Sequence, residues 1–165
     1  MPASPQFPVL DTDPHFRRVV SYMRPSDHLV WAGAAGAFPG AIYAMEMFDP
    51  TRPARGSRSV LRLATLLGVG GGFLLAYQRS SFRLWGFTEN APEAARAEEE
   101  GASAAGLDPS KSGLDPYLRG VAHRNSAWSQ LKFSVLPWFN VVNHEHHGEA
   151  AAKVMAEAKQ GADDE

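Results

Sequence analysis

Residues 60–77, VLRLATLLGVGGGFLLAY, form one of two long apolar stretches in this chain, and residues 29–47, LVWAGAAGAFPGAIYAMEM, form the other. A membrane-spanning helix needs about 20 mostly apolar residues, and both stretches reach or approach that length. Each holds one ionisable residue near an end, Arg62 or Glu46. The mid-stretch glycines and Pro39 would destabilise a water-exposed helix, whereas membrane helices tolerate both residue types. The composition therefore predicts two transmembrane helices; the alternative is a pair of buried helices in a soluble protein.

Small residues recur every four positions in both stretches. Four-residue spacing keeps the members of such a ladder near one face of a helix. Membrane helices use faces of this kind to bring their backbones close together. We therefore expect two helix-packing ladders. The first ladder is Ala32, Gly36, Gly40 and Ala44, and the second ladder is Ala64, Gly68, Gly72 and Ala76.

The fold class that follows is mainly α and membrane-bound: a two-helix transmembrane hairpin with a short amphipathic N-terminal helix and an extended, partly irregular C-terminal segment. The N-terminal helix is expected over residues 15–23, with Asp13 as N-cap and Pro14 at the first helical position, lying on a lipid or a protein surface. A further short helix, capped by Asn90, is expected over residues 92–100. The expected segments are 1–28 (arm and short helix), 29–48 (transmembrane helix 1), 49–59 (arginine-rich loop), 60–78 (transmembrane helix 2), 79–116 (charged linker) and 117–165 (aromatic-rich segment and short helix).

Composition excludes several classes of function. The chain has 165 residues, a formal net charge of −2 and no cysteine. It therefore has no basic bias for nucleic acid, and disulfides, iron–sulfur ligation and thiol catalysis are excluded. Neither apolar stretch carries an ionisable residue at mid-depth, which argues against a transporter or pump with its own active site. Asp11, Asp13 and Asp27 are expected at caps and turns rather than in a catalytic pair.

Histidines and aromatic rings mark the C-terminal segment. His144, His146 and His147 are the one metal candidate, but no cysteine or suitably spaced acid supports a closed site. We therefore expect a surface or interface cluster, and no metal, cofactor-binding or catalytic residue. Large rings in a proline-broken sequence are expected to contact a partner. These partner-contact residues are Trp128, Phe133, Trp138 and Phe139.

Two blocks of sequence resemble one protein family. The first is FPVLDTDPHF at residues 7–16, continuing into RPSD at 24–27; the second is NSAWSQ at 125–130 with PWFNVVNH at 137–144. The chain resembles the fungal 21 kDa-type accessory subunit of mitochondrial NADH:ubiquinone oxidoreductase, respiratory complex I. The resemblance implies a supernumerary subunit without catalytic, quinone-binding or redox residues of its own.

The role implied is assembly and stability of the membrane arm of this NADH-to-ubiquinone electron-transfer, proton-pumping complex in the mitochondrial inner membrane. The implied partners are core and accessory membrane-arm subunits, together with phospholipids. The alternative is a small self-associating two-span membrane protein, a channel- or carrier-like oligomer.

Arginine placement gives an expected orientation. Arg17, Arg18, Arg24, Arg79, Arg83 and Arg96 lie on the terminal side of the spans, against Arg52, Arg55, Arg58 and Arg62 on the loop side. The positive-inside rule then predicts that both termini face the matrix.

Overall fold

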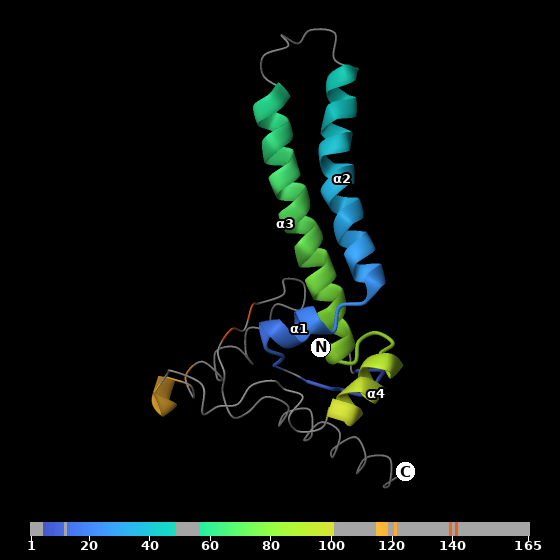
Figure 1. Cartoon of the computed structure of the whole chain (residues 1–165), viewed down its shortest axis with the longest axis vertical. Helices are drawn as coiled ribbons and strands as arrows, with labels where there is room; N and C mark the ends of the chain where they lie inside the picture. The colour runs from blue at the N-terminus through green and yellow to red at the C-terminus, as the bar shows by residue number, and fades with distance from the viewer. Residues whose placement is uncertain are drawn as a thin grey trace. The chain divides into compact units, whose positions relative to one another are not determined.

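The computed structural model describes residues 5–11, 13–48, 57–100, 115–118, 121, 139 and 141. Within this part of the chain there are helices and no strands, so the expected mainly helical fold is confirmed (Figure 1). Contacts divide the chain into a hairpin unit, Met23–Arg79, and a terminal unit, Met1–Tyr22 with Ser80–Glu165. The helices are α1 (Phe16–Ser21), α2 (Pro25–Met47), α3 (Ser57–Leu84) and α4 (Ala91–Glu100).

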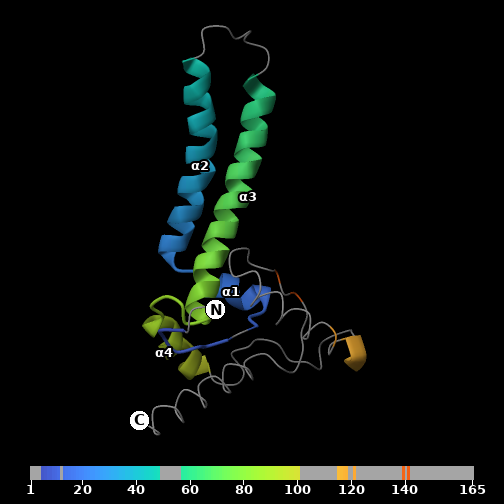
Figure 2. The ribbon, with the colours of Figure 1, turned by 180° about the vertical axis from the view of Figure 1, so that it is seen from behind.

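The hairpin unit consists of α2 and most of α3, which run antiparallel and side by side in both views (Figures 1 and 2). Helix α2 begins where it does because Arg24 precedes a proline and is held extended, with φ −79° and ψ 158°. The carboxylate of Asp27 accepts a hydrogen bond from the Arg24 amide at 2.9 Å, which caps the first turn. The helix then continues through Pro39 to Met47.

One described helix is long and apolar enough to cross a bilayer, namely α3 over Arg58–Leu84. Only 22% of its most apolar window is buried within the chain, whereas the core helix of a soluble protein is mostly buried. Helix α2 has 23 residues, but no stretch of it is apolar enough to meet the same requirement. Length and composition therefore identify one candidate span where the sequence predicts two.

The terminal unit begins with an extended arm that pairs with the end of α3. The amides of residues 6 and 7 donate to Gly86 O at 3.1 and 3.0 Å, and those of residues 10 and 11 donate to Leu84 O at 2.9 and 3.1 Å. The last carbonyls of a helix have no partner within the helix itself. The arm supplies donors at the point where α3 ends.

Helix α1 is shorter than the predicted 15–23, and the predicted N-cap is wrong. His15 is the N-cap, because its Nδ1 accepts the Arg17 amide at 3.0 Å. The amide of Asp13 instead donates to the Asp11 carboxylate at 3.0 Å. Val19 is fully buried, so this apolar side chain of α1 packs within the protein.

Candidate partner-binding surfaces

The second ladder lines the contact between α2 and α3, and all four of its residues are buried. A Cβ added to Gly72 would lie 2.7 Å from Trp31 O, and one added to Gly68 would lie 3.1 Å from Ala34 O. The indole N–H of Trp31 donates to Val69 O at 2.9 Å. The two backbones approach this closely because glycine leaves no side chain between them.

The first ladder does not take part in this contact, and all four of its residues are exposed. A Cβ added to Gly36 or Gly40 would meet nothing within 4 Å. Helix α2 turns Ala34 toward α3, and Ala34 is two residues, about 200° of helical rotation, from Gly36. The two ladders therefore do not face one another, and the first lies on the outward side of the hairpin.

Large apolar side chains are also exposed along both helices of the hairpin. Scattered exposed apolar residues are normal, but exposure of this many large ones indicates a membrane or protein contact. The exposed side chains are Leu29, Phe38, Tyr43, Met45, Met47 and Phe48 around α2, and Leu63, Leu66, Leu67, Val69, Leu74 and Leu75 on α3.

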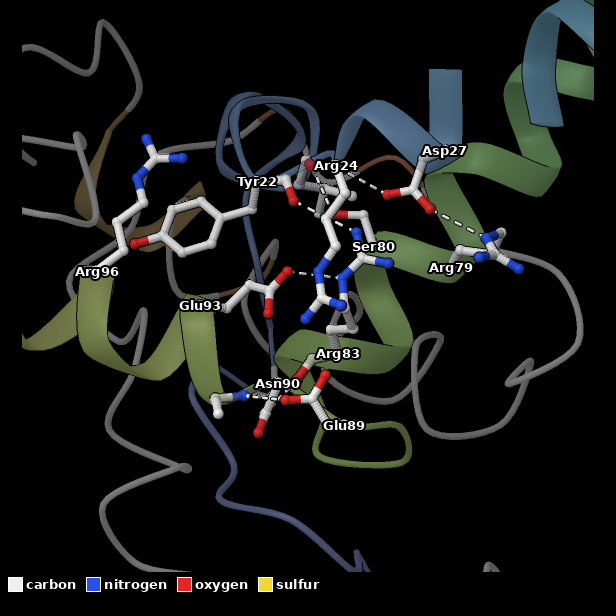
Figure 3. Close-up of polar contacts among 12 residues, drawn as sticks. Tyr22, Arg24, Asp27, Arg79, Ser80, Arg83, Glu89, Asn90, Glu93 and Arg96 are labelled. Carbon is white, nitrogen blue, oxygen red and sulfur yellow. Dashed lines mark hydrogen bonds and ion pairs between the residues drawn. The ribbon is translucent and has the colours of Figure 1, made fainter. Parts of the chain in front are cut away.

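Charged side chains occupy much of the core of the terminal unit. Arg18 pairs with Asp11 at 2.6 Å. Arg83 pairs with Glu93 at 2.9 Å (Figure 3). Both partners of each pair are buried. Removing one partner of a buried pair leaves an uncompensated charge, which is strongly destabilising. These pairs therefore fix which segments meet in this unit.

Asn90 joins three segments of the terminal unit and is almost fully buried. Its side-chain amide donates to Pro8 O in the arm and to Arg83 O near the end of α3, both at 2.7 Å. Its own carbonyl accepts the Ala94 amide at 2.8 Å and so starts α4.

Replacing Asn90 with aspartate should destabilise the terminal unit by about 2 kcal/mol, because both N–H donors are lost and a carboxylate then faces two carbonyl oxygens. Thermal unfolding of the purified full chain in detergent measures the loss. Glu89→Gln is the neighbouring control, since Glu89 is exposed. Equal stability of Asn90→Asp and Glu89→Gln would contradict the role given to the Asn90 amide.

Tyr22 connects α1 to α4. Its hydroxyl donates to Glu100 Oε2 at 2.7 Å, and the Arg96 guanidinium lies 4.2 Å from the centre of its ring. Burial, with Glu100 adding to it, raises the pKa of Tyr22, and the hydrogen bond from Tyr22 lowers the pKa of Glu100. Because folding lowers the pKa of the Glu100 carboxyl, the contact stabilises the folded chain at pH values above the unfolded-state pKa of that carboxyl. This stabilisation is lost as the pH falls through the folded-state pKa. The contact is therefore strongest near neutral pH.

Of the predicted partner-contact residues, Phe139 is described. Its ring packs edge-on against Phe16 of α1, with centroids 5.5 Å apart. Trp128, Phe133 and Trp138 lie outside the described residues, as do His144, His146 and His147. Within the described ranges, no group of three or more histidine, cysteine, aspartate or glutamate side chains could hold a metal ion.

Two family models match this chain in succession. The model of the NADH-ubiquinone oxidoreductase complex I 21 kDa subunit matches residues 4–89, and the model of the C-terminal part of that subunit matches residues 104–164. The NADH-ubiquinone oxidoreductase 20.9 kDa subunit of Neurospora crassa is 42% identical over 162 residues, covering 93% of this chain and 83% of that protein. The first match includes the arm, α1 and both helices of the hairpin. The chain therefore belongs to the family of the 21 kDa subunit of NADH-ubiquinone oxidoreductase, complex I.

Proposed function

We propose that this chain is a non-catalytic accessory subunit of the membrane arm of mitochondrial complex I, anchored in the inner membrane by a two-span hairpin. Family membership supports the assignment to complex I. The anchoring is supported by the apolarity of α3 and by the exposed apolar side chains of the hairpin.

The pairing of the arm with the end of α3 carries the argument for two spans. Residues 10 and 11 donate to Leu84 O, so the segment before α2 and the segment after α3 lie on one side of any membrane. If α3 crosses the bilayer, the chain must cross it once more between residues 11 and 57. Helix α2, with 23 residues, is about 34 Å long, and a bilayer core is about 30 Å thick. We assign the second crossing to α2.

The orientation that we propose places both termini in the matrix, since six arginines near the spans lie on the terminal side against four on the loop side. An epitope added after Glu165 should then resist protease in mitoplasts with an intact inner membrane. Digestion of that epitope would show that the C-terminus lies outside the matrix and that the proposed orientation is wrong.

The role that we propose is structural. The exposed first ladder gives a neighbouring transmembrane helix a surface on which backbones can approach closely, and this contact supports assembly and stability of the complex. The first ladder, on α2, provides this surface, because the second ladder is already buried in the contact between α2 and α3.

Replacing Gly36 with leucine should leave the isolated chain as stable as wild type, because an added Cβ meets nothing within 4 Å. Incorporation into the complex should fall, since overpacking a close contact costs about 1–3 kcal/mol, which weakens association about 5- to 150-fold. Native electrophoresis of mitochondrial membranes in mild detergent measures incorporation. Ala37→Leu is the matched control, because Ala37 is also exposed on α2 but lies off the ladder.

The same gels test the function as a whole. Comigration of the wild-type chain with NADH dehydrogenase activity supports the proposal, and resistance to alkaline carbonate extraction supports the membrane anchor. Migration as a small homo-oligomer, independent of that activity, would instead establish the self-associating membrane protein.

A further inference from the structure

The arginines at the two ends of α3 differ in how their charge is compensated. At the end nearest the termini, Arg79 pairs with Asp27 at 3.0 Å and Arg83 pairs with buried Glu93 at 2.9 Å. At the other end Arg58 and Arg62 are exposed, and no ion pair joins either of them to a carboxylate of the described residues.

The sequence around that end cannot supply enough carboxylates. Residues 46–62 contain two acids, Glu46 and Asp49, and four arginines. If each acid pairs with one arginine, two arginines still lack a carboxylate partner. This end of the hairpin therefore carries a net positive charge whichever pairs form.

Arg58, Arg62 and Leu66 share one face of α3, because they follow one another at intervals of four residues. That face points away from α2. Arg62 and Leu66 each lie two residues from buried Ala64, which places both about 160° around the helix from it. Leu66 is 71% exposed, and Gly70, one turn deeper, has nothing within 4 Å of an added Cβ.

Along this face the two arginines are followed by an apolar residue, and in a phospholipid the phosphate is likewise followed by the acyl chains. Two guanidinium groups one turn apart repel one another unless an anion lies between them, and arginine binds phosphate oxygens in bidentate fashion. An exposed leucine and an uncovered glycine continue the face toward the middle of the helix. A phosphate can therefore be held by the arginines while an acyl chain lies along the leucine.

We propose that Arg58 and Arg62 bind the phosphate of an anionic phospholipid, whose acyl chain lies against Leu66 and the uncovered backbone at Gly70. This inference rests on the proposed function, because it requires α3 to span a bilayer. The protein-bound lipid offsets part of the positive charge that the chain leaves uncompensated at the loop end of the hairpin.

The test uses the full chain purified in a neutral detergent, with phosphatidylglycerol as the probe and phosphatidylcholine as the uncharged comparison. Native mass spectrometry measures the fraction of chain that retains lipid at each concentration.

Each arginine near an anionic bilayer surface contributes roughly fivefold to binding. Arg62→Gln should therefore weaken phosphatidylglycerol binding about fivefold, and the double variant Arg58→Gln, Arg62→Gln should weaken it about thirtyfold. Arg17→Gln removes one exposed charge elsewhere and should leave binding unchanged.

Four outcomes would overturn the proposal. Equal losses of phosphatidylglycerol binding in Arg62→Gln and Arg17→Gln would show that the arginines act only by general charge attraction. If the double variant bound phosphatidylglycerol as well as the wild-type chain does, Arg58 and Arg62 would not form the site. Displacement of the lipid by inorganic phosphate at matching concentration would make it a simple anion site. Loss of the double variant from complex I with its lipid retained would identify an acidic protein surface as the occupant.

Alkaline carbonate extraction separates this proposal from the proposed function. Release of the wild-type chain from the membrane would contradict both the membrane anchor and the lipid site. If the chain stayed in the membrane but the double variant bound lipid unchanged, only the lipid site would be contradicted.

Discussion

The Gly86→Ala substitution should destabilise the terminal unit by about 3 kcal/mol, through two effects at one position. Gly86 has a φ of +74°, a conformation that costs an ordinary L residue about 1–2 kcal/mol. Its would-be Cβ would also overlap the carbonyl oxygen of Phe7. That oxygen belongs to backbone in the arm, so no side-chain rotation can relieve the overlap.

Hydrogen exchange measured on the full chain in detergent gives the most direct reading. The amides of residues 6, 7, 10 and 11, which donate to the end of α3, should lose protection in Gly86→Ala. Thr88→Ala, two residues further on at an exposed position, should leave them protected. Protection at wild-type level in Gly86→Ala would show that the arm does not need the glycine.

The Gly72→Leu substitution should destabilise the hairpin unit by about 3 kcal/mol, at the upper end of overpacking costs, because the added side chain meets backbone. An added Cβ alone would lie 2.7 Å from Trp31 O. The hydrogen bond between the Trp31 indole and Val69 O should break as the helices separate. The fluorescence of Trp31 reports this change if the other three tryptophans are replaced by phenylalanine.

The adjacent Gly71 provides the matched control. An added Cβ at Gly71 meets nothing within 4 Å, so Gly71→Leu should keep the hairpin intact and raise its helix propensity. If Gly71→Leu and Gly72→Leu unfold at the same temperature, the close approach of α2 and α3 contributes nothing specific. In that case the burial of the second ladder would not be what holds the hairpin together.

The hairpin was the most predictable part of the fold, because local patterns specify it. Apolar length indicates where α2 and α3 lie, although α2 already begins at Pro25 and α3 continues to Leu84. The spacing of small residues identified two possible packing faces but could not say which one meets the other helix. That choice depends on how the helices rotate about their axes, which is decided by side chains such as Trp31 and Ala34 on the facing side.

The terminal unit was much less predictable, because its contacts join segments that are distant in sequence. The Asn90 amide reaches Pro8, 82 positions earlier, and Ser80 donates to Val19 O, 61 positions earlier. Sequence patterns predict the two short helices of this unit and a capping role for Asn90, but neither of these long-range contacts. One contact of the terminal unit is local in sequence. Asp11 precedes α1 and Arg18 lies within it, seven residues later, and this separation allows the two side chains to form an ion pair. Nothing in the sequence distinguished that pairing from a simple turn.

The contact of the arm with residues 84 and 86 has a consequence for the order of biogenesis. The arm is synthesised before the hairpin, but its hydrogen-bond acceptors lie at and beyond the end of α3, so the contact closes a loop that contains both long helices. Contacts of such separation form late, after local helices have been established. Until residues 84 and 86 have been synthesised and α3 has formed, the amides of the arm lack these acceptors and are open to proteases. Protection of residues 6–11 therefore reports that the chain has folded through the end of α3.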